Sequence, residues 1–205
     1  MNNQFRPAER SDSPMAVKLL ATTTGEFGVS TLGLGSPKLQ FAALQKWFCS
    51  PGNRFSYQVS LISQQESKIT GLLVRFSGSR LASLELGCIK QMIPIYGLLG
   101  AVKMIRRNKL LASAKEAERD EYYISHLAVD TEFRRQGIAQ ELINRAIEET
   151  QREKLDRLVL SVEIDNSPAI QLYLKMGFRI VDTKEFKELS PGVKSPGFHK
   201  MLRIV

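Results

Sequence analysis

Hydrophobic positions change their spacing from segment to segment, and the spacing predicts the elements. Apolar and polar residues alternate over residues 57–62, and residues 69–76 are rich in Leu and Val, so both segments are predicted strands. The polar link between them, residues 63–68, is short, which favours a hairpin. An edge strand is predicted at residues 5–7. A helix is predicted at residues 11–24, where apolar side chains recur at helical spacing.

The middle of the chain alternates between a glycine-rich stretch and helical patterns. Residues 25–35 contain several glycines and are predicted to be a loop. Ser36 and Pro37 are typical of a helix start, and apolar residues follow at helical spacing as far as Phe48. Residues 77–120 form a long connection with helical patterns at 81–89 and 95–111.

The last third has the clearest pattern. Residues 122–129 and 158–162 are predicted strands, and residues 137–154 form an amphipathic helix between them. A second helix begins at Ser167 and ends before Gly177, and strands at 178–181 and 198–204 close the chain. A strand–helix–strand order requires parallel pairing, whereas the earlier hairpin is antiparallel. We therefore expect an α/β fold with a mixed, mostly antiparallel sheet, one parallel pair, and helices on both faces.

Composition supports one soluble globular domain. The chain has 205 residues, 43% of them hydrophobic and 24% charged, so we expect residues 1–205 to form a single domain. Cys49 and Cys88 are expected to be free thiols of a cytoplasmic protein. No spacing of His, Cys, Asp or Glu predicts a metal site, and no apolar segment is long enough to predict a membrane span. The net charge of +8 suits a phosphorylated ligand, a nucleic acid or an acidic surface.

One turn has the composition of a phosphate site. The strand at 122–129 runs into a turn with Arg134, Arg135 and Gly137, and Gly137 opens the next helix. Free amides and the helix dipole at such an end favour an anion, and glycine admits it close to the backbone. The small Ala139 leaves room, and the arginines add charge. By itself the same pattern also fits an ordinary solvated turn.

A second motif changes that balance. Residues 162–178 read VEIDNSPAIQLYLKMGF, with Asn166, Tyr173 and Gly177 at spaced positions. Together the two segments resemble the GNAT superfamily of acetyl-CoA-dependent N-acetyltransferases. The first segment is similar to its Arg/Gln-x-x-Gly-x-Gly/Ala pyrophosphate motif, and the second to its Asn-x-x-Ala-x-x-Leu-Tyr-x-x-x-Gly-Phe motif. The clear match covers residues 122–181.

The resemblance implies a cofactor site at a slot between two splayed strands. The strand at 122–129 would pair with the pantetheine arm, and the amides from Arg135 to Ala139 would hold the pyrophosphate. The residues implied to bind acetyl-CoA are Leu127, Ala128, Val129, Arg134, Arg135, Gln136, Gly137, Ile138, Ala139, Asn166 and Tyr173. Asn166 also fits a helix cap, and Tyr173 also fits a core position.

The resemblance also implies catalytic roles. Tyr173 would protonate the departing thiolate. Strict alternation along the strand would place Tyr123, Ser125 and Leu127 on the substrate face and His126 on the other. This arrangement favours Tyr123 and Ser125, holding a water chain, over His126 or Glu121 as the route for the amine proton.

The acceptor side is less defined. Four aromatic residues precede the predicted sheet, where they would either line an acceptor pocket or fill the core: Trp47, Phe48, Phe55 and Tyr57. The connection at 77–120 is long for the family, and it would shape the acceptor side or the contact of a homodimer.

These observations predict an N-acetyltransferase that moves an acetyl group from acetyl-CoA to a primary amine of a small molecule, peptide or protein. The alternative is a CoA-binding regulatory module without turnover. Nucleic-acid binding ranks third, because the basic residues at 103–109 are not interleaved with aromatic residues. No membrane partner is expected.

Overall fold

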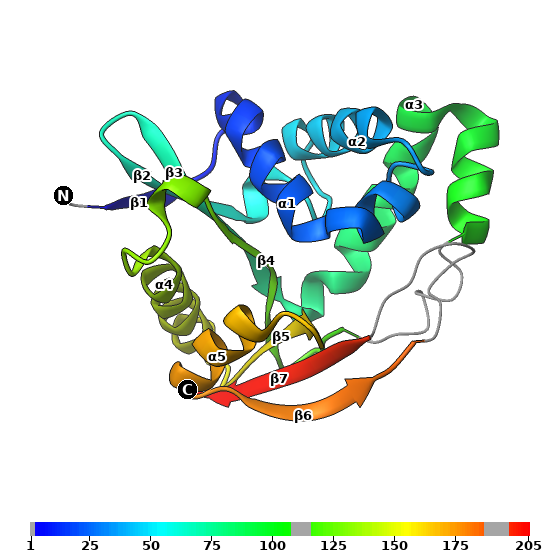
Figure 1. The fold of residues 1–205 in the computed structure, drawn as a ribbon. Coiled ribbons are helices and arrows are strands. Elements are labelled where there is room, and N and C mark those ends of the chain that lie inside the picture. Colours follow the sequence, from blue (N-terminus) through cyan, green and yellow to red (C-terminus); the bar gives the residue numbers. More distant parts are fainter. Residues whose placement is uncertain (1–2, 108–115, 187–196) are drawn as a thin grey trace.

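A computed structural model describes residues 3–107, 116–186 and 197–205, and these form one mixed sheet with helices on both sides (Figure 1). The sheet has seven strands in the order β1-β2-β3-β4-β5-β7-β6. Their bounds are β1 Gln4–Pro7, β2 Ser60–Gln65, β3 Lys68–Ser77, β4 Tyr122–Val129, β5 Arg157–Glu163, β6 Arg179–Lys184 and β7 Phe198–Ile204. Among these described strands only β4 and β5 pair in parallel, as the strand–helix–strand order predicts.

The helices divide between the two faces of the sheet. Helices α1 (Ser13–Thr31), α2 (Pro37–Cys49) and α3 (Leu81–Arg107) pack on one face, around the fully buried Trp47 and Phe48. Helices α4 (Ile138–Arg152) and α5 (Ser167–Lys175) pack on the other face, around Ile138 and Leu142. Burial of these two apolar layers supplies most of the driving force for folding. The expected fold class is confirmed.

The loop expected at 25–35 is wrong, because α1 continues through most of it. Gly25 takes a φ of 49° and kinks the helix, which then resumes and ends at Thr31. Gly28 lies where α1 meets α2: a Cβ there would come within 2.5 Å of side-chain atoms of Thr24 and Gln40. The glycine therefore allows two helices to pack closely, and it does not mark a loop.

Two other segments differ from expectation. Residues 57–59 form a 3-10 turn, and the strand expected over 57–62 is β2, which starts at Ser60. The two helical patterns at 81–89 and 95–111 belong to one helix, α3, kinked at Gly97 with φ 69°. The end of the second pattern, 108–111, and the basic Lys109 lie outside the described residues.

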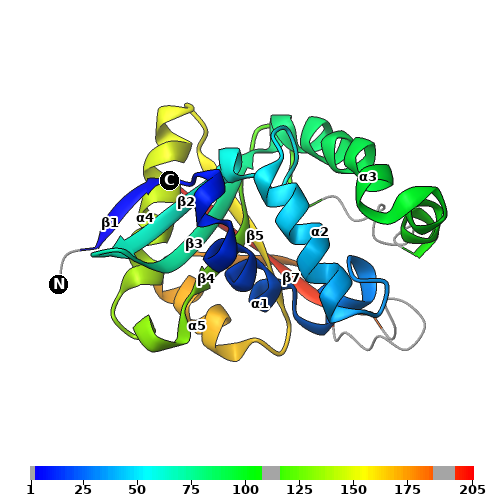
Figure 2. The same cartoon turned by 90° about the horizontal axis from the view of Figure 1, so that it is seen from above.

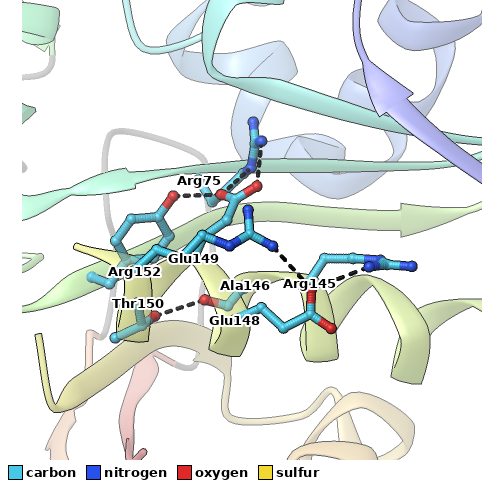
Figure 3. A network of polar contacts seen from close by, with 8 residues as sticks. Arg75, Arg145, Ala146, Glu148, Glu149, Thr150 and Arg152 are labelled. Atoms are coloured by element: carbon cyan, nitrogen blue, oxygen red, sulfur yellow. Dashed lines mark hydrogen bonds and ion pairs between the residues drawn. The ribbon is translucent and has the colours of Figure 1, made fainter. Parts of the chain in front are cut away.

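Helix α4 is tied to the sheet by a polar network (Figure 3). Arg75 on β3 donates from Nε and Nη2 to the two carboxylate oxygens of Glu149, at 2.9 and 2.7 Å. The Tyr122 hydroxyl donates to the same carboxylate at 2.6 Å. One residue of α4 therefore bridges two neighbouring strands. This fixes the helix whose first turn follows the candidate phosphate loop.

Candidate functional site

The two parallel strands pair only at their beginning. β4 and β5 are paired at Tyr122–Leu158, Tyr123–Val159 and Ile124–Leu160. β4 runs on to Val129 and β5 to Glu163, and over these described residues no further ladder joins them. The strands diverge there in Figure 1. The backbone edge of β4 that faces β5 is therefore free for another chain or a ligand beyond Ile124.

A β-bulge lies where the pairing ends. Val74 of β3 pairs with His126, and the next residue, Arg75, pairs with Ile124, so Ser125 is an extra residue in β4. A bulge breaks the alternation of side chains. Ser125 and His126 consequently lie on the same side of the sheet, the α1–α3 side, and both line one cavity there.

The strict alternation expected for this strand is therefore wrong in its second half. Tyr123 and Ser125 line the cavity as expected, but His126 joins them. Leu127 packs with the α4–α5 layer and does not share their face.

The loop between β4 and α4 has two residues in the left-handed region. Arg135 has a φ of 61° and Gly137 a φ of 82°. Gly137 is also the N-cap of α4, and no side chain caps this helix end. The free amides of the first turn can therefore donate hydrogen bonds to a bound anion. The dipole of the 15-residue helix also favours negative charge there.

The other residues of the loop are placed as follows. Arg134, Arg135 and Gln136 are exposed, and Gln136 accepts a hydrogen bond from Gln65 at 3.4 Å. The Ile138 side chain is buried in the α4–α5 layer, so only its backbone is available to a ligand. Ala139 follows it in the first turn of α4. The loop is thus basic, exposed and contiguous with a helix start.

The three β4 residues assigned to the cofactor pair with β3 on one side. Leu127, Ala128 and Val129 lie opposite Leu73, Leu72 and Gly71. Their other side faces the opening toward β5. An extended ligand can add to this edge as a strand would.

Asn166 and Tyr173 have structural roles of their own. Asn166 is the N-cap of α5, and its Oδ1 accepts from the Ala169 amide at 3.3 Å. Tyr173 packs edge-on against Phe178 with ring centroids 5.7 Å apart, in the α4–α5 layer. Burial raises the pKa of Tyr173 to about 12, so its hydroxyl stays protonated at neutral pH.

A cavity of about 470 Å³ lies between β4 and the helices α1, α2 and α3. Its apolar wall includes Phe27, Trp47, Phe55, Met92 and Met104. Phe55 stacks between the rings of Trp47 and His126, at centroid distances of 5.3 and 5.5 Å. Two of the four aromatic residues considered for an acceptor pocket therefore line this cavity.

The other two aromatic residues do not line it. Phe48 is fully buried in the core. Tyr57 lies under the guanidinium of Arg10, whose central carbon is 5.6 Å from the ring centroid. Glu121 is also committed elsewhere, because its carboxylate accepts from Lys200 at 2.8 Å and from the Glu118 amide at 2.7 Å.

An arginine–carboxylate cluster forms the polar end of the cavity. The two Nη atoms of Arg54 donate to the two carboxylate oxygens of Glu116, at 2.5 and 3.1 Å. A carboxylate oxygen of Glu85 lies 3.5 Å from Nη1 of Arg54. Burial opposes ionisation of Glu116, but Arg54 outweighs it and lowers the pKa of this carboxyl. Arg54 also donates to the Ser125 hydroxyl at 3.2 Å. Tyr123 forms a side-chain hydrogen bond with Glu116. Burial and the negative charge of this carboxylate raise the pKa of Tyr123 well above its usual value.

Sequence reasoning missed this cluster. Arg54 follows the Pro–Gly–Asn turn after α2, and Glu116 lies in the connection before β4. No local pattern marks either residue, because 62 positions separate them along the chain.

The hydrogen bonds of His126 assign its tautomer. The Thr23 hydroxyl donates to the Leu20 carbonyl at 2.8 Å, and it lies 3.1 Å from His126 Nδ1. Since this hydroxyl has one proton, it accepts from Nδ1–H, and the lone pair of the neutral ring is on Nε2. Burial and the charge of Arg54 lower the pKa of His126 to about 3. The ring is therefore neutral, with an acceptor nitrogen at Nε2.

Three buried polar atoms of cavity residues lack a hydrogen-bond partner: Trp47 Nε1, Arg54 Nε and His126 Nε2. In the part of the chain that the structure describes, no other buried side-chain nitrogen or oxygen is unpartnered. Such atoms cost about 1–3 kcal/mol each unless a ligand or water satisfies them. Their concentration in one cavity indicates a binding site for a molecule with polar groups. Among the described residues, no group of His, Cys, Asp or Glu is arranged to hold a metal ion.

Residues 96–178 match the family model described as Acetyltransferase (GNAT) family. Over 56 residues the chain is 46% identical to N-alpha-acetyltransferase 30 of Saccharomyces cerevisiae, covering 27% of this chain and 32% of that protein. Over 84 residues it is 34% identical to GCN5-related N-acetyltransferase 6, chloroplastic, of Arabidopsis thaliana, covering 40% of this chain and 29% of that protein. The chain thus matches about a third of the length of these curated relatives.

Solved structures match over the whole chain. An N-acetyltransferase from Staphylococcus aureus Mu50 superposes with a TM-score of 0.74 at 23% identity, covering 97% of this chain and 99% of that chain. A GNAT family acetyltransferase from Elizabethkingia anophelis, solved with acetyl-CoA bound, superposes with a TM-score of 0.58 at 16% identity, covering 100% and 99%. At these sequence identities the structural similarity establishes the fold alone.

Proposed function

Because residues 96–178 match the GNAT acetyltransferase model and the chain has the fold of a solved N-acetyltransferase, we propose that it transfers an acetyl group from acetyl-CoA to a primary amine of a small molecule, peptide or protein. One observation carries this proposal: the opening between β4 and β5 begins at the bulge that places Ser125 and His126 on the cavity. β4 then continues into an uncapped, basic helix start suited to phosphates. A single strand therefore connects a phosphate site with an acceptor cavity.

In this proposal the backbone of β4 and the loop hold the cofactor. The amides from Arg135 to Ala139 bind the pyrophosphate, Arg134 and Arg135 add charge, and the free edge of β4 at Leu127–Val129 pairs with the pantetheine amides. Asn166 stays a helix cap that places the start of α5 beside the opening. Bound acetyl-CoA supplies a thioester whose acyl carbon accepts the amine nitrogen as its carbon–sulfur bond breaks.

The amine must reach that carbon without its proton. His126 Nε2 can accept a hydrogen bond from a neutral amine and orient it, but a pKa near 3 makes the ring a poor proton store. Tyr123 and Ser125 line the same wall and can pass the released proton to water. Tyr173, protonated at neutral pH, donates to the departing thiolate.

The cavity favours an amine with an apolar body. Aromatic and methionine side chains form an apolar part of its wall, and the carboxylate of Glu116 there is already paired with Arg54. An α-amine, with a pKa near 7.7–8.0, is partly neutral at physiological pH, whereas a lysine amine near 10.4 is almost fully charged. A small amine or a peptide N-terminus beside an apolar side chain suits these walls best.

Calorimetric titration with acetyl-CoA tests the cofactor site. We expect the wild-type chain to bind, and an Arg135→Glu/Gly137→Asp variant to bind at least about tenfold more weakly, since it places two carboxylates at the pyrophosphate. An Arg145→Glu/Arg152→Glu variant, altered on the exposed face of α4, is the control and should bind as wild type does. Absence of binding by the wild type would refute the proposal.

Turnover is then measured as thiol release with panels of apolar and cationic amines. Release with an amine supports the enzyme. Binding without release for any amine would favour a regulatory CoA-binding module instead.

A further inference from the structure

The second half of α3 has an apolar stripe that faces away from the protein. Leu98, Leu99, Val102 and Ile105 have exposed fractions of 67%, 81%, 41% and 53%. Their spacing places them on one side of the helix, while Ala101 and Met104 on the other side are buried. We call these four exposed residues the α3 stripe. Contiguous apolar surface of this kind on a soluble domain marks a contact site.

Basic residues accompany the α3 stripe. Lys103 and Arg106 are exposed on the same two turns, and Lys90 is exposed in the first half of the helix. The sequence from Leu98 to Arg107 contains no Asp or Glu. The stripe thus combines exposed aliphatic side chains with uncompensated positive charge. This combination is typical of a helix that lies in the interface of an anionic membrane.

The helix is fixed along the domain and does not project from it. The region Gly78–Arg106 is long and apolar enough to cross a membrane by length and composition alone, and 17% of its most apolar window is buried. However, Lys46 of α2 donates to the Pro94 carbonyl at 2.9 Å, and the Tyr96 hydroxyl donates to the carbonyl of Leu32, the residue that follows α1, at 2.7 Å. Cys88 and Met104 belong to the core. One face of α3 is therefore held by the protein, and the α3 stripe is on the other.

The end of the molecule that carries α3 is opposite the N-terminus (Figure 2). We propose that this end docks on an anionic lipid surface. The α3 stripe enters the boundary between headgroups and acyl chains, while Lys103 and Arg106 pair with lipid phosphates. This peripheral contact departs from the expectation of no membrane partner, it requires no membrane span, and it is independent of the proposed acetyl transfer.

Charge distinguishes this partner from two others. A second copy of the chain would bring two sets of basic residues together, with no acidic residue between Leu98 and Arg107 to pair with them. A nucleic acid would pair with the charges but would leave four aliphatic side chains in water. An anionic bilayer satisfies both features of the stripe.

Docking would also set the distance between the cavity and the lipid surface. Met104 lines the cavity from the side of α3 opposite the stripe. The acceptor cavity would then be held about one helix diameter, roughly 10 Å, from the lipid headgroups.

Vesicle flotation of the full chain tests the proposal. We expect it to float with vesicles of phosphatidylcholine and phosphatidylglycerol but not with phosphatidylcholine alone, and less as salt is added. Leu98→Ser/Leu99→Ser should abolish flotation. Lys103→Gln/Arg106→Gln should weaken binding about 25-fold, since each charge near the surface contributes about fivefold.

Matched controls alter similar residues elsewhere. Ile180→Ser/Val181→Ser removes two exposed apolar side chains of β6, and Lys18→Gln/Lys38→Gln removes two exposed charges, so both should float as wild type does. Acetyl-CoA binding by the same samples reports their folding and tests the cofactor site separately.

Three results would overturn the docking proposal. One is a wild-type chain that does not float with anionic vesicles, and another is flotation that either Leu98→Ser/Leu99→Ser or Lys103→Gln/Arg106→Gln leaves unchanged. The third is a dimer, seen by light scattering, that only Leu98→Ser/Leu99→Ser dissociates and that does not float.

Discussion

At the scale of single residues, burial sets the protonation states at the candidate site. It lowers the pKa of His126 to about 3 and raises that of Tyr173 to about 12. Neither side chain changes its charge between pH 5 and pH 9. In the proposed reaction the ionisation that limits transfer near neutral pH is therefore that of the acceptor amine, and acetylation should rise with pH as the amine loses its proton.

The proposed role of the Tyr173 phenol as a proton donor can be separated from its packing. Tyr173→Phe keeps the ring that packs on Phe178 but removes the proton donor. We expect thiol release to fall about a hundredfold, because general acid catalysis contributes at least that much, while the Kd for acetyl-CoA stays within about twofold. Calorimetry and stopped-flow thiol detection measure the two quantities. Unchanged turnover would leave Tyr173 as a core residue only.

What the sequence predicts at this scale depends on how local the signal is. The placement of Arg135 and Gly137 in a strand-to-helix turn follows from a few adjacent residues. The position of His126 does not, since the bulge depends on the register with β3. The pair of Arg54 and Glu116 joins two irregular segments and has no periodicity to reveal it.

At the scale of elements, α4 and its anchor determine where the candidate phosphate loop lies. The helix is apolar on one side, with Leu142 and Ile143 fully buried. Glu149 then fixes it to β3 and β4 through Arg75 and Tyr122 (Figure 3). The loop 134–137 is thus a short connection between two restrained elements.

Loss of the anchor should cost more than loss of an exposed pair on the same helix. Arg75→Met leaves the half-buried Glu149 carboxylate without its bidentate partner, at a cost of about 1–3 kcal/mol in the free energy of unfolding. Arg152→Met breaks an exposed pair with Glu148 and should cost less than about 0.5 kcal/mol. Urea denaturation compares the two variants. Equal costs would show that the anchor does not stabilise the fold.

Most elements can be predicted from periodicity, and the exceptions have physical causes. The amphipathic pattern of α4, the alternation that begins before β2 and the Leu- and Val-rich run of β3 are local, and the predicted element types of α4, β2 and β3 are confirmed. The second half of α1 is missed because Gly28 serves a contact with α2 that only the tertiary structure reveals.

At the scale of the whole molecule, the two helical layers meet at one break in the sheet. α1, α2 and α3 border the cavity on one side, and α4, which follows the candidate phosphate loop, packs with α5 on the other. Past Ile124 the sheet is not continuous between β4 and β5. A ligand can therefore pass from one face to the other without crossing a hydrogen-bonded ladder.

β4 is one residue longer than its ladder with β3 requires. Removal of Ser125 would join the registers on either side and keep His126 and Tyr123 on their present face. The shortened chain should unfold at an equal or higher urea concentration than the wild type, yet release no thiol, because the straightened strand closes the opening. A shortened chain that stays active, or fails to fold, would contradict this. The expected result would mean that Ser125 is not needed for the stability of β4 but is needed for acetyl transfer.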